Sequence, residues 1–570
     1  MCGISGILIR EDLTPEQKDE LLLEYHKSSR KIKHRGPDRT IDVQLAHPIN
    51  ATITFHRLAI MDPSTKGDMP FRYEEGRRTV YVTANAEIYK FKDIALAEDF
   101  KLASGSDCEI IIHLYKKYGV AGLHAMCNRL NSEHAFSILD VDMVTGDYKL
   151  ILSNDRYGKR PLFTKVDSKG FYYSSEMQGL PDVKSLIGKV ERFPARHFGV
   201  IEKKDGRLGE MKYWEYYKVK PDPEEKICND VEVAKKTIRE LFIDAVVCRL
   251  ESDRPIGCLL SGGLDSSLVS AVAARYLRKF GRRLRTFSIG IKGTDSIDRP
   301  YAEKVAKFID SEHTFVEFTE QQFLEALVDV IITTGTFDIT TIRASTGQYL
   351  ISKWISENTD VKVLFCGDFS DETNSAYLYS FFAPTPYDLH LDAIRLINDI
   401  HFFDGLRADR ATSRWGIELR LPFGDHRLVD YTLRVAPELR TPHYKGIEKW
   451  LLRAAFEHDN ILPHDVLFRI KSAFSDSIAS KKRSWVSIIK EMVETKYTEE
   501  DLKIAQTKYV HLPPISKESL YYREVFCAYY GENISVSQTI PYFWMPKWCD
   551  AKDPSARVLS VCKEGVHKID

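Results

Sequence analysis

The chain has 570 residues, of which 43% are hydrophobic and 11% aromatic, so it is too long for one core and apolar enough for two or three globular domains. Its 81 lysines and arginines balance 82 aspartates and glutamates, and no sequence-wide basic field indicates a nucleic-acid partner. No charge-free apolar run reaches the roughly 18 residues that span a bilayer. The ten cysteines show no CxxC pair or Cys/His ligand spacing, so we expect a reducing, cytoplasmic compartment without a zinc site, disulfide scaffold or membrane segment.

The chain opens Met1-Cys2-Gly3, and removal of the initiator would place a thiol on the terminal residue itself. An α-amino group has a pKa of about 7.7 to 8.0 and a thiol one of about 8.5, so near neutral pH the amine can accept the proton as sulfur attacks. Cys2 would then be both nucleophile and base. On these three residues alone, an accidental early cysteine is an equal alternative.

The first 200 residues combine short strand-like runs with turn clusters such as Gly36-Pro37-Asp38. Strands are predicted over residues 79–83, 149–152 and 170–174, and a helix over 108–117. Residues 202–230 are rich in charge and dotted with proline, a composition typical of a link between domains. We therefore expect a boundary near 215–230.

The rest of the chain begins with a helical pattern over 231–250 and a buried-strand signal over 256–260. A glycine loop and a helix rich in alanine and leucine follow, which together form the unit of a parallel α/β sheet. Strands predicted over 284–291 and 362–366 suit the same sheet, and residues 388–496 are mostly helical in pattern.

The segment from Ser261 to Ser267 reads Ser-Gly-Gly-Leu-Asp-Ser-Ser and lies between that strand and that helix. Paired glycines let the backbone approach an anion, hydroxyls add donors, and the helix N-terminus supplies free N–H groups. The loop lacks the Gly-Lys-Ser/Thr ending of a P-loop, and Asp265 is placed to hold magnesium. A glycine turn without function is the alternative. The motif is similar to the pyrophosphate-binding loop of ATP pyrophosphatases, which split ATP between the α and β phosphates and adenylylate a substrate.

Cys2 and this loop together resemble glutamine-hydrolysing asparagine synthetase, and the resemblance covers nearly the whole chain. The matching segments are Met1 to Ile4, His34 to Asp38, Arg57-Leu58, Glu87 to Tyr89, Ser104 to Glu109, Ser175 to Met177, Ser261 to Ser267, Trp415 to Glu418, Pro422-Phe423 and Phe474 to Asp476. Most telling is Thr340 to Thr346, which looks like the stretch that separates asparagine synthetases from relatives such as β-lactam synthetases.

The resemblance implies an α/β and α+β architecture with two catalytic domains. Residues 1–205 would form an amidotransferase domain of the N-terminal-nucleophile fold, with stacked antiparallel sheets between helices. Residues 206–230 would be the linker, 231–540 a parallel-sheet ATP pyrophosphatase domain that synthesises asparagine, and 541–570 a C-terminal tail.

In the first domain, the resemblance implies that Cys2 attacks glutamine and that Arg57 clamps its α-carboxylate. Asp107 and Glu87 would receive the amino end and neighbouring polar atoms, and Asn85 would donate into the oxyanion hole. The remaining residues expected to bind glutamine are Leu58, Ala59, Ile60, Met61 and Ala86, of which Ala86 is also expected to be catalytic because it keeps its backbone N–H. Taken singly, Arg57 or Asp107 is more often part of a surface ion pair.

In the second domain, the resemblance implies sites for ATP and aspartate. Leu260, Ile289, Cys366 and Gly367 would frame adenine and ribose, and the loop residues Ser261, Gly262, Gly263 and Ser266 would hold phosphate. Asp265 and Asp371 would bind Mg²⁺, Asp368 would be catalytic, and Lys471 would neutralise charge on the α-phosphate and departing pyrophosphate. Thr341, Arg343 and Ser345 would shape the aspartate site. Ammonia would reach the β-aspartyl adenylate through an apolar passage, which keeps it from water.

Several positions depart from the family pattern in the first domain. Ala86 replaces a glycine, and a left-handed backbone there would cost about 1 kcal/mol or more. The usual Gln-Pro reads Met69-Pro70, and the usual Gly-Met-Phe-Ala-Phe reads Ser-Glu-His-Ala-Phe over 132–136.

The second domain also departs from the pattern at its reacting centre. The usual Ser-Gly-Glu-Gly-Ser-Asp-Glu reads Cys-Gly-Asp-Phe-Ser-Asp-Glu over 366–372, so Asp368 is one methylene shorter. A misplacement of about 1 Å at a reacting centre can cost two orders of magnitude in rate. Phe369 replaces a glycine of the family pattern, and Gly335 replaces a glutamate. Residues 373–377 replace a run that contains paired glycines, and residues 469–474 replace Arg-Gln-Lys-Glu-Gln-Phe.

The favoured hypothesis is a ligase that converts aspartate, ATP and glutamine to asparagine, AMP, pyrophosphate and glutamate. One alternative is a related ATP-dependent amide or lactam synthetase acting on another carboxylate, against which the segment 340–346 argues. The other alternative is a catalytically weakened or ammonia-dependent homologue, motivated by Ala86, Phe369 and Gly335. Family members are commonly homodimers, so a homodimer stays open.

Overall fold

The computed structural model describes residues 1–219, 227–471, 478–480, 483–545 and 548. The chain forms two compact units. The first contains Met1–Lys218 together with two later segments, Ser413–Ile417 and Cys527–Thr539, and the second contains most of the remainder from Val219 on. Nothing in the local sequence marks these two later segments as part of the first unit.

The first unit contains two antiparallel sheets. One has the order β10-β8-β9-β1-β3-β2 and the other β12-β11-β7-β6-β5-β4, with β13 beside β11. The strands are β1 Gly3–Ile9, β2 Arg39–Leu45, β3 Ala51–Arg57, β4 Phe71–Glu75, β5 Arg78–Ile88, β6 Ser132–Asp142, β7 Tyr148–Asn154, β8 Phe163–Val166, β9 Gly170–Ser174, β10 Lys189–Arg192, β11 His197–Lys204, β12 Arg207–Leu208 and β13 Lys212–Glu215. The strands predicted over 79–83, 149–152 and 170–174 are confirmed as parts of β5, β7 and β9.

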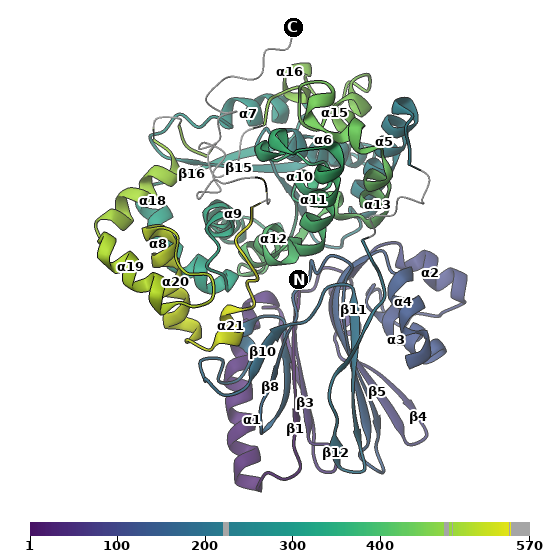
Figure 1. The fold of residues 1–570 in the computed structure, drawn as a ribbon. Helices are drawn as coiled ribbons and strands as arrows, with labels where there is room; N and C mark the ends of the chain where they lie inside the picture. Colours follow the sequence, from purple (N-terminus) through teal and green to yellow (C-terminus); the bar gives the residue numbers. More distant parts are fainter. Residues whose placement is uncertain (220–226, 472–477, 481–482, 546–547, 549–570) are drawn as a thin grey trace. The chain divides into compact units, whose positions relative to one another are not determined.

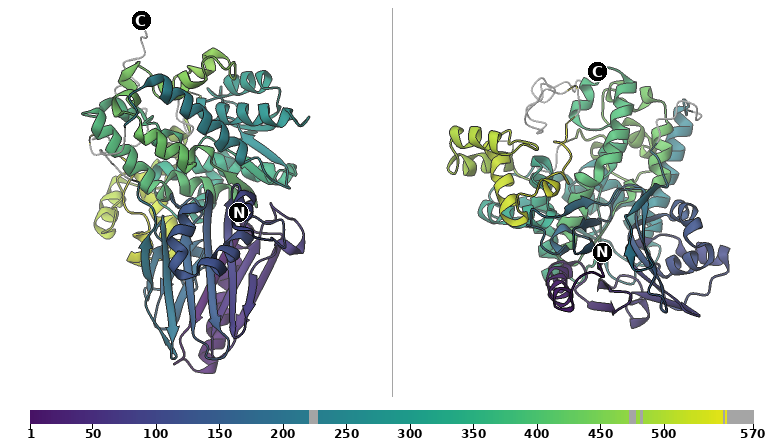
Figure 2. Two further views of the ribbon diagram at one scale, coloured as in Figure 1. Left: turned by 90° about the vertical axis from the view of Figure 1, so that its right-hand side faces the viewer. Right: turned by 60° about the horizontal axis from the view of Figure 1, so that its bottom comes forward.

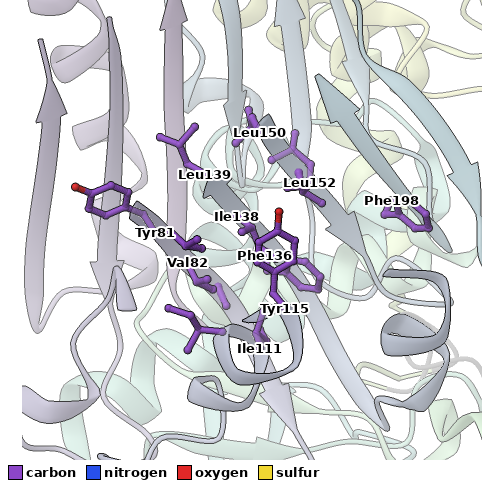
Figure 3. Packing of buried hydrophobic residues seen from close by; sticks show 14 of the residues in the cluster. Tyr81, Val82, Ile111, Tyr115, Phe136, Ile138, Leu139, Leu150, Leu152 and Phe198 are labelled. Carbon is purple, nitrogen blue, oxygen red and sulfur yellow. The ribbon is translucent and has the colours of Figure 1, made fainter. Parts of the chain in front are cut away.

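The two sheets stack against each other between helices (Figure 1, Figure 2). The helices are α1 Pro15–Ser29 on the first sheet, and α2 Phe91–Glu98, α3 Glu109–Tyr118 and α4 Leu123–Arg129 on the second. One hydrophobic cluster combines side chains from both sheets with side chains of α3. Figure 3 shows part of it, where Ile111 and Tyr115 of α3 pack with Val82, Phe136 and Ile138. Burial of these apolar side chains is the main force that joins sheets and helices.

The second unit contains a parallel sheet with the order β16-β15-β14-β17-β18. Its strands are β14 Ile256–Leu259, β15 Arg285–Ile291, β16 Glu312–Phe318, β17 Val363–Phe365 and β18 Glu418–Arg420. The chain first builds outward on one side of β14 and then returns to its other side with β17. A topological switch point of this kind places a ligand crevice at the carboxyl ends of the strands.

Helices surround this sheet and form the rest of the second unit. The first five are α5 Val231–Cys248, α6 Leu264–Arg278, α7 Arg299–Phe308, α8 Glu320–Thr334 and α9 Ile339–Asn358, of which α6 packs on β14 and α7 and α9 pack on β15. Those that follow are α10 Ser370–Thr373, α11 Pro386–Asp399, α12 Asp404–Ser413, α13 His426–Arg434, α14 Pro437–Arg440, α15 Trp450–Phe456, α16 His464–Leu467, α18 Trp485–Glu494, α19 Glu499–Lys508 and α20 Lys517–Tyr530. The end of α20 from Cys527 on and the short α21 Ile534–Ser537 belong to the first unit. Within the described ranges, no helix combines the length and apolar character needed to cross a membrane.

Candidate active sites

The sulfur of Cys2 lies beside the end of β3. Cys2 directly precedes β1, which pairs with β3 so that Gly3 lies opposite His56. This register brings Cys2 Sγ within 3.4 Å of the backbone nitrogen of Leu58. Arg35 Nε also donates a hydrogen bond of 3.0 Å to the Cys2 carbonyl oxygen. The partly buried thiol is therefore held next to the segment 58–61, which the sequence predicts to bind glutamine.

Arg57 is the last residue of β3 and is 4% exposed. Its side chain forms hydrogen bonds with the loop that follows residues 58–61. Its Nη1 donates to the Ser64 carbonyl oxygen and to Asp68 Oδ1, each at 2.6 Å. Its Nη2 donates to the carbonyl oxygens of Met61 and Asp62. The guanidinium expected to clamp glutamine thus already binds one carboxylate, that of Asp68.

Asn85 and Ala86 lie side by side in β5. Neither atom of the buried Asn85 side-chain amide has a hydrogen-bond partner among the described residues, which is unfavourable unless a ligand supplies one. Ala86 pairs regularly with His134 of β6 and has no left-handed backbone, so the strain considered for this alanine does not arise. The structure therefore leaves the Asn85 amide available to donate toward an oxyanion.

The acidic residues Glu87 and Asp107 are both buried near this end of β5. Asp107 Oδ2 accepts a hydrogen bond of 2.7 Å from the backbone nitrogen of Ile88. The next residue, Cys108, approaches the carbonyl oxygen of Ala86 at 3.6 Å. Asp107 therefore fastens the start of α3 to the strand that carries Asn85.

The polar residues that replace the family pattern in β6 have partners. Fully buried Glu133 lies 3.0 Å from Arg160 Nη2 and 3.7 Å from Lys159 Nζ. His134 Nδ1 lies 2.7 Å from Ser132 Oγ, and its Nε2 lies 3.3 Å from Ser153 Oγ. Paired in this way, the buried charges and the histidine are tolerated beside the strand that carries Asn85.

In the second unit, the predicted phosphate loop connects β14 to α6. Ser261 Oγ lies 2.9 Å from Ser266 Oγ and accepts a hydrogen bond from the Gly263 backbone nitrogen at 3.3 Å. No side chain caps the N-terminus of α6, so its first turn can receive an anion. Gly262 has φ +75°, and a Cβ there would come within 2.4 Å of the Ala302 nitrogen, which explains the glycine.

Two lysines bind the aspartates predicted to hold magnesium. Lys449 Nζ lies 2.5 Å from Asp265 Oδ2 and 2.6 Å from Asp371 Oδ1, and Lys471 Nζ contacts the other Asp371 oxygen. Burial alone would raise the pKa of Asp371, but the two ammonium groups outweigh it and hold the pKa below its usual range. Lys449, from the N-terminal end of α15, has no sequence signal that predicted this role.

This carboxylate pair also fits a divalent cation. Asp265 and Asp371 lie close enough to share one Nζ, so a single cation can bridge them. Within the described part of the chain, no cluster of three or more His, Cys, Asp or Glu residues could hold a metal by itself. That is consistent with Mg²⁺, which is commonly bound by one or two carboxylates plus substrate phosphates.

Asp368, three residues before Asp371, forms an ion pair of its own. Its Oδ1 accepts a hydrogen bond of 3.0 Å from Arg407 Nη2, and its Oδ2 accepts one of 3.3 Å from Cys366 Sγ. Burial raises the pKa of Asp368 despite the opposing charge of Arg407. The next residue, Phe369, is 1% exposed and has φ +77°, a conformation that favours glycine.

The segment predicted to bind aspartate forms the start of α9. Thr341 Oγ1 donates to Asp338 Oδ2 at 2.8 Å and Ser345 Oγ donates to the Thr341 carbonyl oxygen at 2.6 Å, so both hydroxyls are used within the helix. Arg343 Nε and Nη2 bind the two carboxylate oxygens of Glu518 at 2.8 and 2.6 Å. Arg343 is thus held in a buried bidentate ion pair.

These groups surround a cavity of about 280 Å³ at the carboxyl ends of β14, β15 and β17. Of the predicted residues, it is lined by Leu260, Ser261, Gly263, Asp265, Ser266, Ile289, Arg343, Cys366, Gly367, Asp368, Asp371 and Lys471. Gly262, Thr341 and Ser345 are not part of its wall. Lining residues without a sequence signal include Gln348, Tyr377, Asp404, Arg407 and Lys449. The motif residues Phe474, Ser475 and Asp476 lie outside the described residues.

Comparison with known proteins shows which family combines these two sites. A glutamine amidotransferase domain model matches residues 1–204, and an asparagine synthase model matches residues 237–392 and 385–544. The asparagine synthetase [glutamine-hydrolyzing] of Gallus gallus is 39% identical over 584 residues, covering 100% of both chains. The chain belongs to this family.

Other glutamine-hydrolysing asparagine synthetases are similarly related. The Homo sapiens protein is 39% identical and covers 99% of this chain and 100% of its own, and the Cricetulus griseus protein is 39% identical with 98% and 99% covered. A solved glutamine PRPP amidotransferase from B. subtilis covers 50% of this chain and 75% of its own at 13% identity. Its TM-score of 0.30 is too low to support an argument.

One departure from the glutamine-hydrolysing asparagine synthetase pattern has a structural reason. Gly335 ends α8 with a left-handed C-cap of φ +63°, and its backbone nitrogen donates to the Ile331 carbonyl oxygen at 2.9 Å. Glycine favours this conformation, so the residue serves helix termination in this member of the family.

Proposed function

We propose that this protein is a ligase that makes asparagine from aspartate, ATP and glutamine. In the first unit, Cys2 attacks the side-chain amide of glutamine, and water then releases glutamate and ammonia. In the second unit, aspartate attacks the α-phosphorus of ATP, and pyrophosphate leaves as the β-aspartyl adenylate forms. Ammonia then displaces AMP and yields asparagine.

The observation that carries this proposal is the phosphate loop beside two aspartates that share Lys449. The loop and the N-terminus of α6 suit the β and γ phosphates, and Lys471 would neutralise the charge that develops on departing pyrophosphate. Asp265 and Asp371 would hold Mg²⁺, which screens phosphate charge when bound. Leu260, Ile289, Cys366 and Gly367 would frame the nucleoside, and Arg343, Thr341 and Ser345 would shape the neighbouring substrate pocket.

For the first unit, we propose that Arg57 receives the glutamine α-carboxylate and that Asn85 stabilises the oxyanion. Glu87 and Asp107 would bind the amino end, and residues 58–61 with Ala86 would complete the pocket. The unpaired Asn85 amide and the position of Cys2 Sγ support these roles. A cytoplasmic location, a homodimer and the lack of a nucleic-acid partner stay predictions from the sequence.

The decisive experiment measures asparagine made from aspartate and magnesium ATP, with glutamine or ammonium as nitrogen source in parallel. We expect product with both sources, and Cys2→Ala should abolish only the glutamine reaction. Product with ammonium alone would contradict the proposed glutaminase. A lack of aspartate-dependent pyrophosphate release with either nitrogen source would contradict the synthetase assignment. Pyrophosphate release with another acid instead of aspartate would identify a related amide synthetase.

A further inference from the structure

One face of α9 forms a wall of the cavity in the second unit. Thr340, Ala344, Gln348 and Ile351 recur at the spacing of a helix and all line the cavity. Thr341 and Ser345 lie outside this stripe and use their hydroxyls within the helix. The long polar side chain that this face presents to the cavity, besides the paired Arg343, is therefore Gln348.

Gln348 is 4% exposed, and its two amide atoms differ in what they contact. Nε2 approaches Asp368 Oδ2 at 3.5 Å, and with Asp368 ionised beside Arg407 the opposite orientation of the amide would place two acceptors face to face. Oε1 is buried and has no hydrogen-bond partner among the described residues. A buried acceptor of this kind is unfavourable unless a ligand supplies the donor.

Most carboxylates around the cavity already bind a lysine or an arginine, and Gln348 Oε1 is a neutral acceptor among them. Asp265 and Asp371 bind Lys449, and Asp368 binds Arg407. The hydroxyl oxygen of Tyr377 lies 2.6 Å from Glu372 Oε1 and 3.1 Å from Asp404 Oδ2, so its single proton can be donated to either carboxylate. A cationic donor entering this cavity therefore finds an unused acceptor at Gln348 Oε1 without breaking an existing ion pair.

We propose that Gln348 Oε1 accepts a hydrogen bond from the α-ammonium group of the amino-acid substrate, and that Gln348 thereby selects aspartate over acids that lack this group. The inference rests on the proposed function and deepens it, because it assigns the amino end of aspartate to the Gln348 face of α9. The cavity's lysines and arginines are donors and cannot recognise an ammonium group. Gln348 is thus a specificity-determining residue for this reaction.

The test compares aspartate with succinate, which carries the same two carboxylates but no amine. Pyrophosphate release is measured with ammonium as nitrogen source, so that the first unit plays no part. We expect Gln348→Met, which keeps the length of the side chain but removes both polar amide atoms, to lower the aspartate-to-succinate ratio of kcat/KM by about tenfold or more. The KM for ATP should not change. Gln321→Met, the same substitution at an exposed position of α8, should leave the ratio unchanged.

An unchanged ratio, with kcat lowered equally for both acids, would overturn the inference and show that Gln348 acts only by positioning Asp368. Calorimetric binding of aspartate beside a non-hydrolysable ATP analogue provides a second readout that does not need turnover. Weaker binding to Gln348→Met than to the wild type supports the inference, and equal binding overturns it. The proposed function fails separately if the wild type releases no pyrophosphate with aspartate.

Discussion

Arg57 and Asp68 form an ion pair of 2.6 Å at the end of β3, with Asp68 supplying the kind of group that Arg57 is proposed to bind in glutamine. Asp68 also contacts Arg39, which lies directly opposite Arg57 in the β2–β3 pairing. An internal carboxylate of this kind competes with substrate for the same guanidinium.

We therefore predict that Asp68→Asn lowers the KM for glutamine several-fold without changing ammonium-dependent synthesis. The reason is that loss of a partly exposed charged partner frees Arg57 at a cost of only about 1 kcal/mol. Glutamate release measured against glutamine concentration checks this. A raised KM would show instead that Asp68 holds Arg57 in its productive position.

Ala86→Gly should change glutamine kinetics by less than about twofold, because Ala86 already lies in regular strand geometry and a glycine gains nothing there. The free energy of unfolding should fall by about 0.5–1 kcal/mol, as expected for glycine inside a strand. Glutaminase assays and urea unfolding test both statements. A large gain in glutaminase activity would contradict this account of the departure at Ala86.

Lys449→Met should lower kcat/KM for ATP about 100-fold, because Asp265 and Asp371 would lose the cation that bridges them and a positive group near the phosphates. Substrate-dependent pyrophosphate release is the measurement. Lys445→Met, at an exposed position four residues earlier, is the matched control and should retain activity. Equal activity of the two variants would show that Lys449 has no role in the use of ATP.

Phe369 combines a buried ring with φ +77°, so two truncations should separate ring packing from backbone strain. Phe369→Ala and Phe369→Gly both remove the ring and leave cavities that differ by one methyl group. Because only alanine keeps a Cβ in the left-handed conformation, we expect the glycine variant to be more stable by about 1 kcal/mol, the reverse of the usual order. Urea unfolding measures which variant is more stable. Greater stability of the alanine variant would show that the backbone at position 369 is not strained.

Burial, with added effect from Arg156 and Lys159, lowers the pKa of His134 from 6.5 to about 3. Below pH 6.5 the unfolded chain therefore gains a proton that the folded chain does not, and stability falls by about 1.4 kcal/mol per pH unit until about pH 3. Between pH 7.5 and 5.0, the wild type should lose about 2 kcal/mol more than His134→Phe in urea unfolding. Equal losses would show that His134 titrates normally.

Local patterns in the sequence determined much of this protein. Short strand-like runs between turn clusters predicted parts of β5, β7 and β9, and the strand, glycine loop and alanine-rich helix predicted β14 and α6, because such patterns depend on neighbours a few residues apart. Short strands such as β18 Glu418–Arg420 had no comparable signal, since three residues do not establish a period.

The candidate sites show the same division. Cys2 and the loop 261–267 could be recognised because their chemistry lies in contiguous residues. Lys449 and Gln348 could not, because Lys449 reaches Asp265 across 184 positions and Gln348 approaches Asp368 only where α9 passes the end of β17. The sequence by itself determined which chemical groups are present and which short segments carry them. Only the tertiary structure decided which are already paired and which face the cavity, because those pairings depend on packing between segments far apart in the chain.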